Sequence, residues 1–167
     1  MNNRTLIELL HGKGAHVGPE ECVEGLTAES ASSRPAGFSH SIWQQLSHMN
    51  YWMEYELARI SGNRPPYPVR AAESWPAEPA PGDEKEWNLA VSGLRDFLGR
   101  VQLLAEAGPD TLQREVDAAH SSEAGRSSSV QAVLWQIVAH NSYHTGQIVQ
   151  LRRALSLWPP RAGGDTW

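Results

Sequence analysis

Two histidines stand four residues apart near the C-terminal end of the chain, in the segment His140-Asn-Ser-Tyr-His144. On a helix this spacing places both imidazoles on one face, about 40° apart, where they can bind one metal ion. Measured against the apolar residues of the same segment, both lie at the edge of the inward stripe. The zinc-peptidase version of this pattern needs a glutamate after the first histidine as general base. Asn141 stands there, which argues against peptidase chemistry. The spacing alone is a weak signal for a metal site, because surface pairs of histidines four residues apart are common.

A third ligand is expected from His48, the only other histidine inside a long, regular helical segment. It lies roughly 120° from the centre of the main apolar stripe, on a side shared with Trp52 and Tyr55. A helix with two apolar sides contacts two neighbours, so we expect His48 to face the interior. Taken alone, His48 is more simply interpreted as a buried histidine bonded to a backbone or hydroxyl group. His16, beside a glycine-rich turn, stands in reserve as a residue that folds over the site.

Helical periodicity dominates the elements that must position these histidines. Four long amphipathic helices and a short N-terminal one predict an all-α four-helix bundle. Residues 63–82 hold six of the 11 prolines and form an extended connection, long enough to allow two parallel neighbouring helices. The expected helices are Asn3 to His11, a segment from Pro19 that ends before Pro35, residues 42–60, residues 83–107, and a segment from 127–129 to Trp158.

Composition narrows the classes of function. The chain has 167 residues, which predicts one domain over 1–167. The net charge of −5 argues against a nucleic-acid partner, and no apolar run approaches the roughly 18 residues of a membrane helix. The N-terminus lacks a signal-peptide pattern and Cys22 is the only cysteine, so we expect a cytoplasmic protein. Seven tryptophans exceed what one small core hides, which predicts a homodimer.

Taken together, the motifs resemble the DinB-like family of metal-binding helical bundles. The resemblance rests on Ser41-Ile-Trp-Gln…His48-Met-Asn-Tyr-Trp52 and Leu134-Trp-Gln…His140-Asn-Ser-Tyr-His144-Thr-Gly-Gln147-Ile, and it extends over about residues 4–160. It implies an up-down-down-up order of helices, which agrees with the long connection, and one divalent metal held by His48, His140 and His144. It also implies a homodimer, and activities such as the transfer of low-molecular-weight thiols or metal-dependent hydrolysis.

Three neutral imidazoles leave at least one position on the ion open to water or substrate. We expect Zn²⁺ or Ni²⁺, since imidazole suits both, and affinity that falls as pH drops through about 6.5. Such an ion activates a thiol cofactor or a water, so transfer of a thiol to a small-molecule substrate and hydrolysis both fit. The alternative is a non-catalytic metal- or ligand-binding protein of the stress response. Gln44, Gln136 and Gln147 are candidates to accept an imidazole N–H or orient a water.

Overall fold

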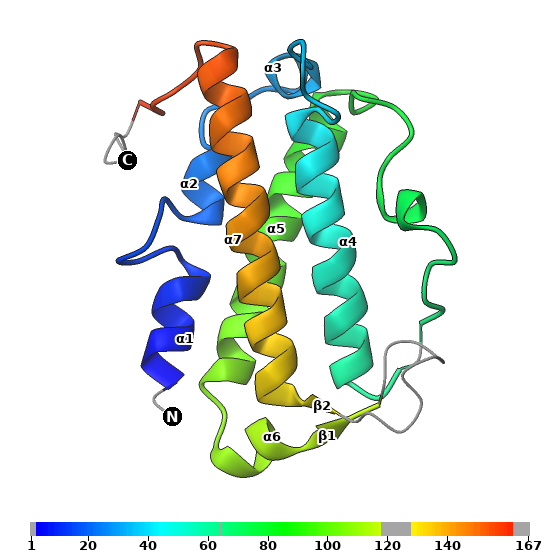
Figure 1. Ribbon diagram of the computed structural model, residues 1–167, viewed down its shortest axis with the longest axis vertical. Helices are drawn as coiled ribbons and strands as arrows, with labels where there is room; N and C mark the ends of the chain where they lie inside the picture. The colour runs from blue at the N-terminus through cyan, green and yellow to red at the C-terminus, as the bar shows by residue number, and fades with distance from the viewer. Residues whose placement is uncertain (1–2, 64, 118–127, 162–167) are drawn as a thin grey trace.

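The computed structural model describes residues 3–63, 65–117 and 128–161 of the chain. Three long helices, α4 (Ile42–Ile60), α5 (Glu84–Ala105) and α7 (Val130–Ala154), form three columns of a bundle. Two short helices, α1 (Asn3–Leu10) and α2 (Pro19–Val23), follow one another along the fourth column and pack against α5 and α7 (Figure 1). The columns run up, down, down and up, with α4 parallel to α5 (Figure 1). The predicted all-α bundle is therefore confirmed.

The segment after Pro19 differs from the single long helix predicted for it. It forms α2 and then a second short helix, α3 (Ala28–Ser32), which lies at the end of the bundle where α4 begins (Figure 1). Gly25 separates them with a φ of +70°, a left-handed conformation that ends a helix and that glycine adopts at little cost. Thr27 then starts α3 with its own capping box to Ser30. Local cap and turn chemistry thus overrides the helical periodicity of this segment.

The long connection between α4 and α5 is held against the first turns of α4. It contains one short 3₁₀ helix, η1 (Ala71–Ser74), and it returns along the bundle to the end where α4 began (Figure 1). Three side chains of α4 and its cap donate to its carbonyls: Ser41 to Pro79, Gln44 to Pro76 and His48 to Ser74. These bonds carry the connection past His48, so its path helps to shape the site.

A short two-stranded sheet closes the opposite end of the bundle. Helix α6 (Pro109–Gln113) leads into β1 (Glu115–Val116), which pairs antiparallel with β2 (Ser128–Ser129). Helix α7 starts directly after β2, where the Ser129 side chain accepts the N–H of Ala132. Among the described residues this is the only sheet, in agreement with the predicted fold class.

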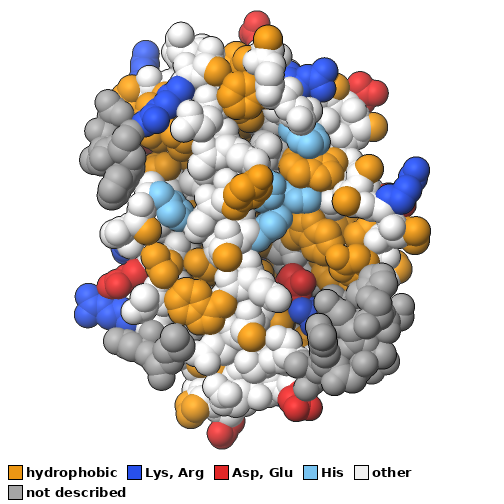
Figure 2. Space-filling model, in the orientation of Figure 1, with side chains coloured by type: hydrophobic (Ala, Val, Ile, Leu, Met, Phe, Trp, Pro, Cys, Tyr) orange, Lys and Arg blue, Asp and Glu red, His pale blue; other side chains and the backbone are white. Residues whose placement is uncertain are grey.

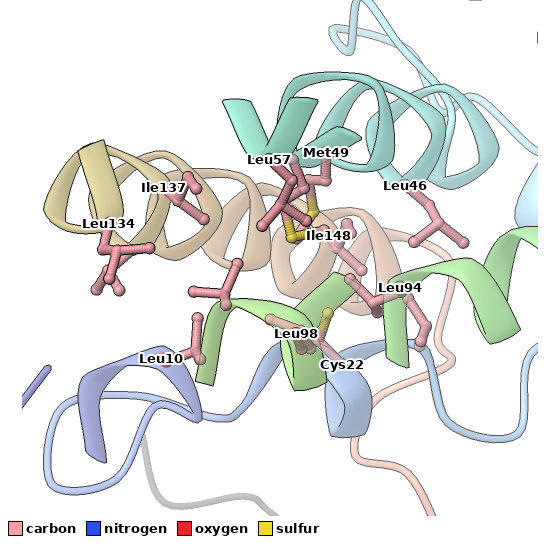
Figure 3. Close-up of a cluster of buried hydrophobic side chains, with 14 of the residues drawn as sticks. Leu10, Cys22, Leu46, Met49, Leu57, Leu94, Leu98, Leu134, Ile137 and Ile148 are labelled. Carbon is pink, nitrogen blue, oxygen red and sulfur yellow. The ribbon is translucent and has the colours of Figure 1, made fainter. Parts of the chain in front are cut away.

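The core lies between the four columns (Figure 3). Met49 and Leu57 of α4 meet Ile148 of α7, while Leu98 of α5 and Cys22 of α2 close the cluster from the other side (Figure 3). The apolar stripe predicted for residues 42–60 is buried at every position. No helix in the described part of the chain combines the length and hydropathy needed to cross a membrane. The core therefore holds α4 and α7 side by side, which is the pair that carries the histidines.

Candidate metal centre

The three predicted histidines come together between α4 and α7. One nitrogen each from His48, His140 and His144 lies within 4.8 Å of the other two, so the three could hold a metal ion. The Nε2 atoms of His48 and His140 are 3.2 Å apart. Tetrahedral zinc with Zn–N bonds of about 2.0–2.1 Å places its nitrogens about 3.3 Å apart. Small ring movements therefore suffice to coordinate one ion, and histidines gather near the middle of the face shown in Figure 2.

Hydrogen bonds outside the trio set which nitrogen of each imidazole is free. His48 Nδ1 lies 3.1 Å from Ser74 O, and a carbonyl only accepts, so Nδ1 carries the proton and Nε2 keeps its lone pair. His144 Nδ1 contacts two amide oxygens, Gln45 Oε1 at 2.6 Å and Gln147 Oε1 at 2.9 Å, which leaves its Nε2 unprotonated as well. His140 therefore donates its Nε2 proton to His48, and it would have to release that proton to bind a metal through this nitrogen.

Burial keeps the trio neutral. Desolvation, followed by the neighbouring imidazoles, lowers the pKa of His144 to about 3. Desolvation also lowers the pKa of His48 to about 4, against the bond to Ser74 that favours the charged form. The pKa of His140 is lowered by the same burial. Neutral imidazole is the form that binds metal. Protons should therefore compete with a metal ion for these imidazoles only at a pH below about 6.5, the pKa of a free histidine.

An indole supports the site from the connection between α4 and α5. The ring of Trp75 stacks on His48 with centroids 3.8 Å apart and planes 9° apart. His40 stacks on the same indole at 3.8 Å and 14°. Together with the bond to Ser74 O, this stack holds the His48 ring in the plane that directs Nε2 at the other two histidines.

The three glutamines predicted near the site take different places. Gln147 hydrogen-bonds His144. Gln44 is occupied in the capping box with Ser41 and by its bond to Pro76, and Gln136 is exposed on α7. Sequence reasoning missed Gln45, although it precedes His48 by three residues and so shares its helix face. It also missed Ser74 and Trp75, for which the sequence carries no comparable signal.

His16, held in reserve from the sequence, does not join the trio. Its Nε2 lies 2.8 Å from Ser142 Oγ and its Nδ1 lies 2.7 Å from Val17 O. Ser142 is about 160° from His140 around α7, so this contact ties the loop between α1 and α2 to the other side of that helix. His16 therefore positions a loop rather than the candidate metal ligands.

A cavity of about 700 Å³ opens beside His144. The loop before α4, the connection and one face of α7 enclose it, and its size matches pockets that hold small molecules. Its wall includes the ring of Trp75 and the amides of Gln45 and Gln147. The site is therefore joined to a space from which a small molecule can approach the open position of an ion.

Comparison with known families supports the resemblance. A family model described as the DinB superfamily matches residues 20–148, a range that includes His48, His140 and His144. The comparison with curated proteins found no match. The matched range covers most of the chain and contains both histidine motifs. On this evidence the chain belongs to the DinB superfamily.

Proposed function

We propose that the protein binds one divalent metal ion, Zn²⁺ or Ni²⁺, through His48, His140 and His144 and acts as a metal-dependent enzyme on a small molecule. The observation that carries this proposal is the convergence of three neutral imidazoles beside a cavity of about 700 Å³. A bound ion supplies Lewis acidity, which lowers the pKa of a water or thiol that it binds. Thiol transfer and hydrolysis are the two reactions that this chemistry serves.

The side chains around the trio support a working site. Ser74 O and the oxygens of Gln45 and Gln147 fix the imidazole protons away from the cluster. Trp75 shields one ring of the trio from water. Three protein ligands are typical of catalytic zinc sites, whereas structural sites have four. The cavity beside His144 favours turnover of a small molecule over a purely metal-holding role.

Metal titration tests the site. Wild-type protein stripped with a chelator should bind one equivalent of Zn²⁺ or Ni²⁺, measured by calorimetry with elemental analysis. A variant with His48, His140 and His144 all changed to Ala should lose this binding. His11→Ala is the control, because His11 bonds Gln102 of α5 and is not one of the three clustered histidines. Equal binding by wild type and the triple variant would show that the site lies elsewhere.

Activity screens separate the enzyme from the alternative role. The metal-loaded protein should conjugate a thiol to an electrophile or hydrolyse an ester or amide, and the triple variant should do neither. If the loaded wild type turns over no substrate in either screen, the non-catalytic metal- or ligand-binding role is favoured instead.

A further inference from the structure

The two glutamines on His144 have one orientation each. Gln45 and Gln147 both place Oε1 on the protonated Nδ1 of His144. An amide that uses its oxygen in this way turns its NH₂ group away from the imidazole, and this group can only donate. The protonation of a single imidazole nitrogen therefore sets the direction of two amides at once.

Both NH₂ groups are reachable from the cavity. Gln45 and Gln147 line it together with His144. Neither Nε2 has a hydrogen-bond partner among the residues that the structure describes, and neither is among the buried side-chain atoms left without one. Among the residues that the structure describes, these two NH₂ groups have no acceptor, and both belong to residues bonded to a candidate metal ligand.

Of the described residues, none with a charged side chain lines the cavity. Its wall contains the rings of Phe38, Trp75 and Tyr143, and the part of the chain that the structure describes contributes no aspartate, glutamate, lysine or arginine to it. The exposed Arg34 reaches the neighbouring loop and bonds Ser39 O, but it does not line the cavity. A flat apolar group of a ligand gains from contact with these aromatic rings.

We propose that this cavity takes an ester or amide that carries an aromatic group, and that Gln45 and Gln147 hold its carbonyl oxygen. Two N–H donors on one carbonyl oxygen are the arrangement that stabilises the oxyanion of acyl transfer. The inference rests on the metal-dependent function proposed above and selects hydrolysis from its two reactions.

The reaction balances with water alone. A water oxygen bonds to the carbonyl carbon, and the electron pair of the C=O bond moves onto the oxygen that the two amides hold. When this pair returns, the bond from carbon to the leaving oxygen or nitrogen breaks, and a water proton passes to the leaving group. The products are a carboxylic acid and an alcohol or amine, and no oxidant or further reactant is needed.

Two aromatic probes test the carbonyl contact by calorimetry on zinc-loaded protein. 3-Mercapto-1-phenylpropan-1-one has a ketone oxygen separate from the thiol that binds the metal, and 3-phenylpropane-1-thiol has the same ring, chain and thiol but no carbonyl. We expect Gln45→Leu and Gln147→Leu each to weaken binding of the mercaptoketone about tenfold, the effect of one lost hydrogen bond, and to change binding of the thiol without a carbonyl much less. Gln136→Leu, an exposed change on the same helix as Gln147, should alter neither.

Each single variant leaves His144 one amide acceptor, so each should still bind one equivalent of zinc, and the probes are compared on zinc-saturated protein. Hydrolysis of 4-nitrophenyl acetate by the loaded protein should fall about a hundredfold in the double variant. If zinc binds normally but both probes bind the variants as they bind wild type, or both weaken equally, this inference is wrong while the proposed metal function stands. If wild type binds no zinc at the trio, the proposed function itself fails.

Discussion

Lowering the pH distinguishes buried metal ligands from an ordinary group of histidines. An imidazole with a pKa of about 6.5 is about nine-tenths protonated at pH 5.5, which costs about tenfold in metal affinity relative to pH 7.5. Three such ligands would lower the metal affinity about a thousandfold over the same pH range. Burial holds the pKa of His48 at about 4 and that of His144 at about 3, so both stay neutral at pH 5.5. Because the pKa of His140 is also lowered, the total loss should be less than about tenfold.

The assay is competition for Zn²⁺ against a chromogenic chelator of known pH dependence at pH 7.5, 6.5 and 5.5. A short peptide with two histidines four residues apart serves as the control. Its imidazoles are exposed to water, so its zinc affinity should fall by about tenfold for each histidine. A fall in protein affinity close to a thousandfold between pH 7.5 and 5.5 would refute the argument that burial keeps the ligands neutral.

The same shifts determine how the metal-free protein responds to acid. The unfolded chain takes up protons at these histidines near pH 6.5, whereas the folded chain takes them up at His48 and His144 only near 4 and 3. The unfolded state therefore binds more protons between these values. The contribution of the two histidines to stability is fully present above about pH 6.5 and is lost as pH falls toward 4. Urea unfolding at pH 7 and pH 5 should show lower stability at pH 5, and a smaller difference in the triple alanine variant.

Three further changes test the support of the site, the core and the assembly. Trp75→Leu should weaken zinc binding about two- to tenfold in calorimetry, because it removes the ring stacked on His48, and unchanged affinity would contradict this role. Leu46→Ala should lower the free energy of unfolding by about 2–5 kcal/mol in urea, since Leu46 is fully buried, whereas Val69→Ala, at a side chain that is 92% exposed, should change it by less than about 0.5 kcal/mol. Light scattering at micromolar concentration should give twice the mass of the 18.4 kDa chain, and Leu103→Glu should reduce it. A monomer mass for wild type would reject the homodimer.

The structure changes the reason for expecting a dimer. The homodimer was predicted from the seven tryptophans of the chain, on the expectation that some lie exposed on the surface of one subunit. None of the described tryptophans is among the exposed large hydrophobic residues. Leu89 and Leu103 of α5 are the exposed aliphatic side chains of that helix, at 62% and 69%. Their separation of 14 residues places them about 40° apart on one face. The dimer therefore stays a prediction, now directed at α5.

Much of the fold follows from the sequence because it depends on local patterns. The stripe from Ile42 to Ile60 and the caps at Ser41, Asp83 and Ser129 each use residues within one or two turns of one another. The prediction failed for the segment after Pro19, where a left-handed Gly25 and the cap at Thr27 divide one expected helix into two. Periodicity alone does not show whether a break of this kind interrupts an otherwise suitable pattern.

In the candidate site, too, some features follow from local sequence and others depend on how distant segments pack. The pairing of His140 with His144 on one face is a property of helical spacing, so the sequence alone determined it. Whether His48 meets them depends on which side of α4 packs against α7, and only the bundle decides that. The residues that contact the trio are still harder to predict from local sequence. Ser74 and Trp75, which contact His48, come from a connection without regular periodicity. Gln45, which bonds His144, is 99 residues away from it in the chain. Contacts between distant segments arise from packing as a whole, so only the tertiary structure reveals how the imidazoles are oriented and what the cavity beside them offers a ligand.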